Sequence, residues 1–202
     1  MNKLIICCGG DNLGKTSLIK GLCEHYDYKN VTIRHCDKPP KDLSPAESLD
    51  FQFKCFYSEA NLIRHIFEKH NKYCYHDNVI IFDRFYLGEF VYGQMFRNMT
   101  SEILKKKILF FEEHFLNYDN VYLITLTADP DFFLSKEDGK SFSQNIEQKT
   151  KELNLFREAC EVSRIKEKLL IKVDNNSQFR TKEEILNETI DFLEHKRTIL
   201  SY

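Results

Sequence analysis

Short runs of apolar, often β-branched residues alternate along the chain with longer segments in which apolar residues recur at helical spacing. This alternation is typical of a parallel sheet whose strands are joined by crossover helices. Because each run is continuously apolar, we expect helices to cover both faces of the sheet. The predicted strands are Lys3 to Cys8, Val31 to His35, Asn78 to Phe82, Asn120 to Leu126 and Leu169 to Val173.

The segments that follow these strands predict the helices. The last one opens with Thr181 and Glu184 at the spacing of a capping box, in which hydroxyl and carboxylate satisfy free N–H groups of the first turn. The predicted helices are Lys15 to Glu24, Ala46 to Lys69, Gly88 to Phe96, Ser101 to Leu116, Gln144 to Ser163 and Thr181 to His195. Together the elements predict an α/β protein with a doubly wound, five-stranded parallel sheet, and its 202 residues fit one domain over residues 1–202.

A glycine-rich loop stands between the first predicted strand and the first predicted helix. Gly9 to Thr16 matches the phosphate-loop pattern G-x-x-x-x-G-K-[ST] in its strand, loop and helix context. Its backbone N–H groups and the start of the following helix can cradle an anion. We expect Lys15 to reach the outer phosphates of a nucleoside triphosphate and Thr16 to ligate the Mg²⁺ that bridges them. The residues expected around the triphosphate are Gly9, Gly10, Asp11, Asn12, Leu13, Gly14, Lys15, Thr16 and Ser17.

A carboxylate and a guanidinium follow the third predicted strand. Parallel strands bring their carboxyl ends to one edge of the sheet, so Asp83 and Arg84 should face the glycine-rich loop. Asp83 is expected to lie near the metal, and Arg84 can hold phosphoryl oxygens with two hydrogen bonds. The simpler alternative is a structural Asp–Arg pair that ends the strand.

The loop, the Asp83-Arg84-Phe85 triplet and the following Tyr86 to Tyr92 resemble the thymidylate kinase branch of the nucleoside monophosphate kinases. The resemblance implies the fold of a P-loop NTPase, with helices on both faces of the sheet and a lid. It also implies transfer of the γ-phosphoryl group of ATP, with Mg²⁺, to a deoxynucleoside monophosphate, with dTMP as the expected acceptor.

The same resemblance implies roles for single residues. Lys15, Asp83 and Arg84 would be catalytic, with Thr16 and Asp83 at the metal. Asp11 would lie near the 3′-hydroxyl of the acceptor, and Arg84 would bind the acceptor phosphate. The protein would be a homodimer, formed through the two predicted helices Ala46 to Lys69 and Ser101 to Leu116, although packing of their apolar faces in the core explains these helices equally well.

The acceptor pocket is expected after the second strand and along the next helix. Beside a pair of prolines, Arg34 or Lys38 would meet the acceptor phosphate, although either can also be a solvated surface residue. Phe56 and Tyr57 are candidates to stack on the base, with ordinary core packing as the alternative. By the resemblance, Tyr92 would exclude a ribose 2′-hydroxyl.

Two positions depart from the family pattern, and a third residue is unusual. Asn61 stands where the family has an arginine, and Gly88 replaces a serine after the Asp–Arg motif. Base selectivity therefore stays open. Glu89 is unexpected, because a carboxylate beside a phosphate acceptor is repulsive unless it faces the base or a lysine. An exposed helix position is the alternative for it.

A polar segment at about residues 135–143 is predicted to be a lid that excludes water from the phosphates. Related kinases carry an arginine there or in the phosphate loop, whereas this chain has Asn12 in the loop and Lys136 and Lys140 in the lid. The two lysines are expected to contact ATP. Arg157 and Arg164, on the helix that follows and just beyond it, are possible substitutes, and Asn175-Asn176 lies where the family holds adenine.

The composition limits the partners and the compartment. The formal net charge is -2 with both signs interspersed, so neither nucleic acid nor an anionic membrane is expected as a partner. The seven cysteines include no C-x-x-C pair, which indicates reduced thiols and a cytoplasmic location. No apolar run approaches the roughly 20 residues that cross a bilayer.

Two other functions fit the same residues. A deoxynucleoside kinase would phosphorylate a hydroxyl and need a carboxylate base, a role open to Asp37. A non-catalytic ATP-binding regulatory module would use the phosphate loop alone, and the missing lid arginine favours it. An acceptor panel that includes both nucleotides and a nucleoside separates these alternatives.

Overall fold

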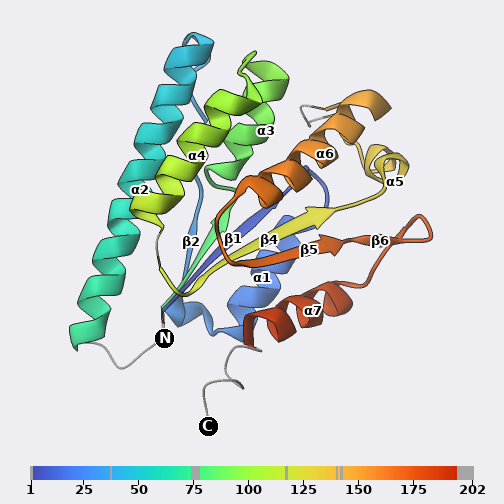
Figure 1. The fold of residues 1–202 in the computed structure, drawn as a ribbon. Helices are drawn as coiled ribbons and strands as arrows, with labels where there is room; N and C mark the ends of the chain where they lie inside the picture. The colour runs from blue at the N-terminus through green and yellow to red at the C-terminus, as the bar shows by residue number, and fades with distance from the viewer. Residues whose placement is uncertain are drawn as a thin grey trace.

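A computed structural model describes residues 2–36, 38–73, 78–116, 118–139, 141 and 143–194. Its central sheet has five parallel strands in the order β2-β3-β1-β4-β5, as Figure 1 shows. This is the doubly wound parallel sheet that the sequence predicts. The strands are β1 (Lys3–Gly9), β2 (Val31–Arg34), β3 (Val79–Asp83), β4 (Val121–Thr127) and β5 (Glu167–Lys172).

The helices lie close to their predicted positions, and one short helix is new. The last predicted helix extended to His195, which lies outside the described residues. None of the described helices is long and apolar enough to cross a membrane. The helices are α1 (Lys15–His25), α2 (Pro45–Tyr73), α3 (Leu87–Phe96), α4 (Ser101–Phe115), α5 (Pro130–Ser135), α6 (Ile146–Val162) and α7 (Lys182–Glu194).

Three short elements have no counterpart in the sequence prediction. They are α5, a 3₁₀ helix at Tyr28–Asn30, and a hairpin of β6 (Asp174–Asn175) and β7 (Gln178–Phe179). Each is too short to produce a readable hydrophobic period. Two of them, α5 and the hairpin, contribute side chains to the site described below.

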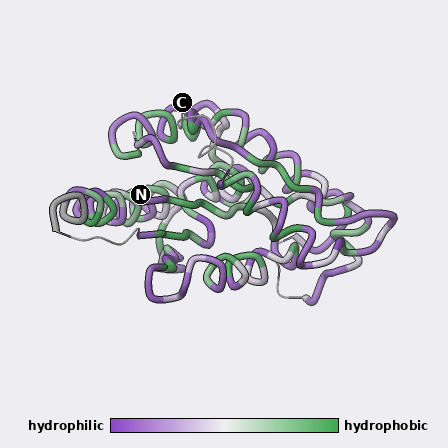
Figure 2. Tube along the Cα trace, turned by 90° about the horizontal axis from the view of Figure 1, so that it is seen from below, coloured by the Kyte–Doolittle hydropathy of each residue, from purple (hydrophilic) through white to green (hydrophobic). Residues whose placement is uncertain are grey.

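Alternate residues of the strands enter two separate cores. Leu4, Ile6 and Cys8 of β1 pack with α2, α3, α4 and α6, whereas Ile5 and Cys7 pack mainly with α1, α5 and α7. The helices therefore form a layer on each face of the sheet, and in Figure 2 the strands run between them. The six described cysteines are free thiols, and burial raises the pKa of the Cys8 thiol to about 12.

The two edge strands differ from the prediction that every strand is covered on both faces. Ile33 of β2 is 43% exposed and Leu170 of β5 is 47% exposed. The expectation holds for β1, β3 and β4, whose apolar residues are buried. A continuous apolar run does not distinguish an inner strand from an edge strand, because that position depends on the strand order.

A buried carboxylate joins three helices behind the sheet. Glu112 of α4 accepts hydrogen bonds from the hydroxyl of Tyr86 at 2.5 Å, the hydroxyl of Ser163 at 2.6 Å and the backbone N–H of Arg164 at 2.5 Å. Tyr86 precedes α3 and Ser163 ends α6. Burial raises the pKa of Tyr86 well above its usual value, so its hydroxyl stays a donor. The network therefore fixes α3 and α6, which carry site residues, relative to α4.

We expect Glu112→Gln to lower the free energy of unfolding by roughly 3 kcal/mol, because an amide cannot accept all three bonds and the buried donors lose their partners. The matched control is Glu113→Gln, which alters an exposed pair with Arg164 at 3.0 Å and should cost under about 1 kcal/mol. Urea unfolding monitored by circular dichroism measures both variants. Equal costs for the two would contradict a structural role for the network.

Candidate active site

The phosphate loop follows β1 and turns directly into α1. Gly9 and Gly14 have φ angles of 133° and 89°, in the region that glycine adopts without strain. A Cβ placed on Gly10 would come within 2.3 Å of the Phe133 ring of α5. Close packing of α5 against the loop therefore requires glycine at position 10.

Lys15 is held inside this loop. Its side chain is only 7% exposed, and its ammonium donates to the Gly10 carbonyl at 2.5 Å. Burial, with a smaller contribution from the nearby Arg84, lowers the pKa of Lys15 to about 8. The ammonium is therefore poorly solvated and has one hydrogen bond to the described residues. An incoming anion would restore favourable charge interactions.

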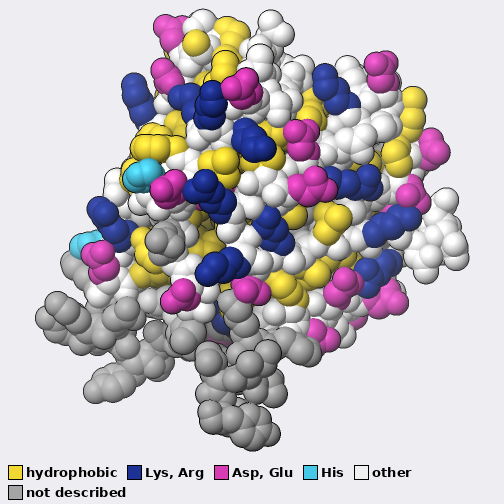
Figure 3. Space-filling view, in the orientation of Figure 1, with side chains coloured by type: hydrophobic (Ala, Val, Ile, Leu, Met, Phe, Trp, Pro, Cys, Tyr) yellow, Lys and Arg dark blue, Asp and Glu magenta, His cyan; other side chains and the backbone are white. Residues whose placement is uncertain are grey.

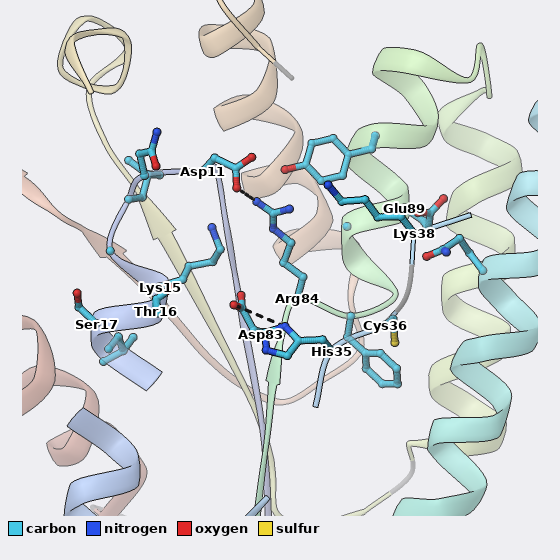
Figure 4. Close-up of a pocket in the computed structure, with 18 of the residues that line it drawn as sticks. Asp11, Lys15, Thr16, Ser17, His35, Cys36, Lys38, Asp83, Arg84 and Glu89 are labelled. Carbon is cyan, nitrogen blue, oxygen red and sulfur yellow. Dashed lines mark hydrogen bonds and ion pairs between the residues drawn. The ribbon is translucent and has the colours of Figure 1, made fainter. Parts of the chain in front are cut away.

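Asp11 of the loop and Arg84 beyond β3 form an ion pair at the centre of the site (Figure 4). Arg84 has a φ of 62°, an unfavourable value for a residue with a side chain. The Tyr92 ring lies 5.5 Å from the guanidinium, and the Tyr92 hydroxyl donates to Glu152 at 3.0 Å. The Nε atom of Arg84 is buried and has no partner among the described residues. An oxyanion in the cleft is the kind of group that could satisfy it.

Asp83 is the last residue of β3, and it lines the same cleft as Thr16 of the loop (Figure 4). Its carboxylate lies 3.8 Å from Nδ1 of the exposed His35. One carboxylate and one hydroxyl are hard oxygen donors, and Mg²⁺ in phosphate sites is commonly bound by such a small set together with phosphate oxygens and water. The described residues contain no cluster of three or more His, Cys, Asp or Glu that could hold a metal alone. The residues present therefore fit a nucleotide-bound Mg²⁺.

These residues line one large cleft of about 1570 Å³. At one end it is bounded by the phosphate loop, Lys136 and the β7–α7 segment, and at the other by α2, α3 and the chain after β2. Of the predicted residues, those that line the cleft are Asp11, Asn12, Leu13, Gly14, Lys15, Thr16, Ser17, Lys38, Phe56, Asp83, Arg84, Tyr92 and Lys136. Lys38 extends towards Arg84 in Figure 4.

Two residues predicted to bind the acceptor lie outside this cleft. Arg34 pairs with Glu59 of α2 at 2.5 Å and 2.9 Å. Tyr57 packs on Phe111 and Phe115 of α4, with ring centroids 5.7 Å and 4.8 Å away. Adjacent helical residues point about 100° apart, so Phe56 faces the cleft and Tyr57 faces α4. Of the paired alternatives, Lys38 and Phe56 are therefore the ones in the cleft.

The loop end of the cleft differs in detail from the prediction. The Lys136 ammonium lies 4.8 Å from the Phe132 ring and 5.3 Å from the Phe179 ring, and the Asn12 amide donates to the Lys136 carbonyl at 3.1 Å. Lys140 lies outside the described residues. Arg157 and Arg164 do not line the cleft. Neither replaces the missing arginine in this structure.

The segment predicted to be a lid is tied to α6. Glu137 accepts from the fully buried Lys149 at 2.5 Å and from the backbone N–H groups of Gly139 and Ser141 at 2.8 Å and 3.3 Å. These contacts outweigh the opposing effect of burial and lower the pKa of Glu137 to about 2. The sequence analysis missed Lys149, since a buried lysine on an amphipathic helix has no signature of its own.

The far end of the cleft contains a charged pair. Glu89 of α3 is 5% exposed and accepts a hydrogen bond from Arg97, and both line the cleft with Ser48, Gln52 and Phe96. The exposed helix position considered for Glu89 is therefore wrong. Arg97 was not predicted. It stands at the C-terminal cap of α3, eight residues after Glu89, which is beyond the spacings of three and four residues at which helical side chains usually pair.

Comparison with known proteins supports the fold. No protein-family model and no curated protein sequence matches the chain. Among solved structures, thymidylate kinase from Candida albicans matches with a TM-score of 0.68 and 13% identity over 97% of this chain and 92% of its own. Thymidylate kinase from Ehrlichia chaffeensis matches with a TM-score of 0.63 and 14% identity over 96% and 99%. YorR protein from Bacillus subtilis, in complex with phosphorylated GDP, matches with a TM-score of 0.57 and 20% identity over 97% and 98%. The chain therefore shares the fold of the thymidylate kinases.

The lowered pKa of Lys15 predicts a pH-dependent affinity for ATP. Lys15 is cationic below about pH 8 and loses its charge above it, so the Kd for ATP should rise about tenfold between about pH 7.5 and about pH 9.5. Isothermal titration calorimetry measures the change. In a Lys15→Arg variant the charge persists, so its affinity, whatever its absolute value, should be constant over this range. A pH-independent Kd for the unmodified protein would contradict the expectation that the Lys15 ammonium contacts ATP.

Proposed function

We propose that this protein transfers the γ-phosphoryl group of ATP to a deoxynucleoside monophosphate and releases ADP and the corresponding diphosphate. The observation that carries the proposal is the single continuous cleft, with the Lys15 and Arg84 cations between its two ends. A pocket for one drug-sized ligand usually measures roughly 300–1,000 Å³, so a cleft of about 1570 Å³ has room for two nucleotides. The thymidylate kinase-like fold supports the same proposal.

Phosphoryl transfer needs mainly position and charge. An oxygen of the acceptor phosphate forms the new bond to the γ-phosphorus, while the bond from that phosphorus to the β–γ bridging oxygen breaks. Because this nucleophile is already anionic, the reaction needs no strong general base. Lys15 would offset the charge on the outer phosphates of ATP, and Arg84 would orient the acceptor phosphate through its free Nε and its Nη atoms.

Asp83 and Thr16 are the residues that would hold Mg²⁺. When bound, the metal neutralises charge on the β- and γ-phosphates. At the loop end, Lys136 and the Phe179 ring line the cleft and would contact the donor nucleotide. Lys140, at the lid, stays a prediction.

Tyr92 is proposed to select the sugar. Its hydroxyl bonds to the buried Glu152 and its ring lies against Arg84, so the ring is fixed at the wall of the cleft. A rigid ring there would leave too little room for a 2′-hydroxyl. Asp11, paired with Arg84, is proposed to meet the 3′-hydroxyl side of the same sugar.

We further propose that two copies pair through α2 and α4, which pack beside each other (Figure 1). Leu62 of α2 and Ile103 and Phe110 of α4 are exposed apolar residues. On the face shown in Figure 3, acidic and basic side chains are interspersed. A cytoplasmic location remains a proposal.

Lys15→Ala should lower turnover with ATP and the best deoxynucleotide by about 10³-fold or more, because the charge on the transferred group is no longer offset. Lys20→Ala, an exposed lysine on the same helix, is the control and should stay within about twofold. ADP release in a coupled assay with dTMP, dGMP, dCMP, dAMP and thymidine measures this. Transfer to thymidine alone would favour a deoxynucleoside kinase, and no transfer to any acceptor would favour a regulatory module.

For the pairing of two copies, light scattering coupled to size exclusion should give twice the 24.1 kDa mass of the chain. Phe110→Glu should shift the protein towards the monomer, since a charge replaces an apolar contact. The far-ultraviolet circular dichroism spectrum should not change. A monomeric unmodified protein at micromolar concentration would contradict this proposal.

A further inference from the structure

Glu89 is the residue of the cleft that phosphate chemistry does not explain. It is buried, and no phosphate-binding role suits a carboxylate, because two anions repel each other. Its recorded hydrogen bond is to Arg97, and burial raises its pKa above the usual range. Placing an ion pair at a ligand cleft is costly unless a ligand completes its hydrogen bonds.

The position of the Glu89–Arg97 pair in the cleft determines which part of the acceptor nucleotide it can contact. Arg84 and Asp11 mark the middle of the cleft, whereas Glu89 and Arg97 stand at the α2–α3 end beside Phe56 and Gln52. In Figure 4 Glu89 lies on the opposite side of Arg84 from Lys15. An acceptor whose phosphate meets Arg84 and whose sugar passes Tyr92 would place its base at this end.

The hydrogen-bonding edge of each base then decides among the four acceptors. A carboxylate only accepts, and an arginine only donates. Guanine presents two adjacent donors, N1–H and the 2-amino group, next to the O6 acceptor. Thymine presents one N–H between two carbonyl oxygens, and those oxygens would be repelled by a carboxylate. Adenine and cytosine each present a single amino donor beside a ring nitrogen that only accepts.

We infer that Glu89 and Arg97 read guanine, with Glu89 accepting from N1–H and the 2-amino group and Arg97 donating to O6, so that dGMP is the preferred acceptor. The inference rests on the proposed transfer to a deoxynucleoside monophosphate and names its base. Phe56, a buried aromatic residue that lines the cleft, would contribute apolar contact to the base. The specificity-determining pair thus lies on α3 and at its C-terminal cap, away from the α2 position where the family's arginine is replaced by Asn61.

The test compares kcat/KM for dGMP, dTMP, dAMP, dCMP and dIMP, which lacks the 2-amino group. The expected result is a dGMP preference of at least about tenfold over each of the other acceptors, dIMP included, because each of the other bases makes fewer hydrogen bonds to Glu89 than guanine does. Glu89→Gln should reduce the ratio of dGMP to dTMP by about tenfold or more, mainly through KM for dGMP. A glutamine offers one acceptor and one donor group where guanine needs two acceptors.

Glu113→Gln is the control, since it alters an arginine-paired glutamate away from the cleft and should keep the ratio. A preference for dTMP, or a Glu89→Gln variant that lowers all acceptors equally, overturns the inference and leaves the kinase proposal intact. If no acceptor is phosphorylated, the proposed function fails, and calorimetric Kd values for dGMP and dTMP then decide the inference. Equal Kd values would overturn it.

Discussion

The parallel pairing of β1 with β3 is the constraint on which the site depends. Its register sets Cys7 opposite Asp83, and the Arg84 N–H donates to the Cys7 carbonyl at 2.9 Å. Because the phosphate loop begins where β1 ends, this register brings Asp83 and Arg84 beside a loop more than seventy positions earlier in the chain. A shift of one residue would exchange the two cores of the sheet, since alternate strand residues face opposite sides. The same apolar contacts that stabilise the fold therefore fix the distance between the loop and the strand end.

The ion pair of Asp11 and Arg84 orients the guanidinium at the centre of the site. Arg84 holds an unfavourable backbone conformation, and the surrounding structure compensates through Asp11, the Tyr92 ring and the hydrogen bond from Tyr92 to Glu152. The Asp11 carboxylate thus accepts a hydrogen bond from an Nη atom of Arg84 that could also donate to a phosphate. The Nε atom of Arg84 is buried and has no partner among the described residues. The guanidinium is oriented before any anion arrives, which lowers the entropic cost of binding.

Sequence reasoning predicted the elements that local patterns encode and missed those that depend on the packing of distant segments. The phosphate loop, the parallel sheet and the placement of Asp83 and Arg84 follow from the loop motif and from the alternation of strands and helices. These predictions agree with the structure. The sequence did not decide between Phe56 and Tyr57, or between Arg34 and Lys38, because that decision needs the direction of each side chain. An error of one residue in the boundary of a helix or strand changes that direction. Arg97 and Lys149 pair with residues eight and twelve positions away, spacings that no local sequence motif marks.

The exposed residues of the edge strands bear on how this molecule avoids aggregation. An unpaired strand edge is a template for addition of a strand from another chain. Here β2 is only four residues long, and β5 carries Glu167, Lys168 and Lys172 among its six residues. Short length on one side and charge on the other disfavour cross-strand association. The sheet is therefore closed to extension at both ends, and contact between molecules is left to helical surfaces.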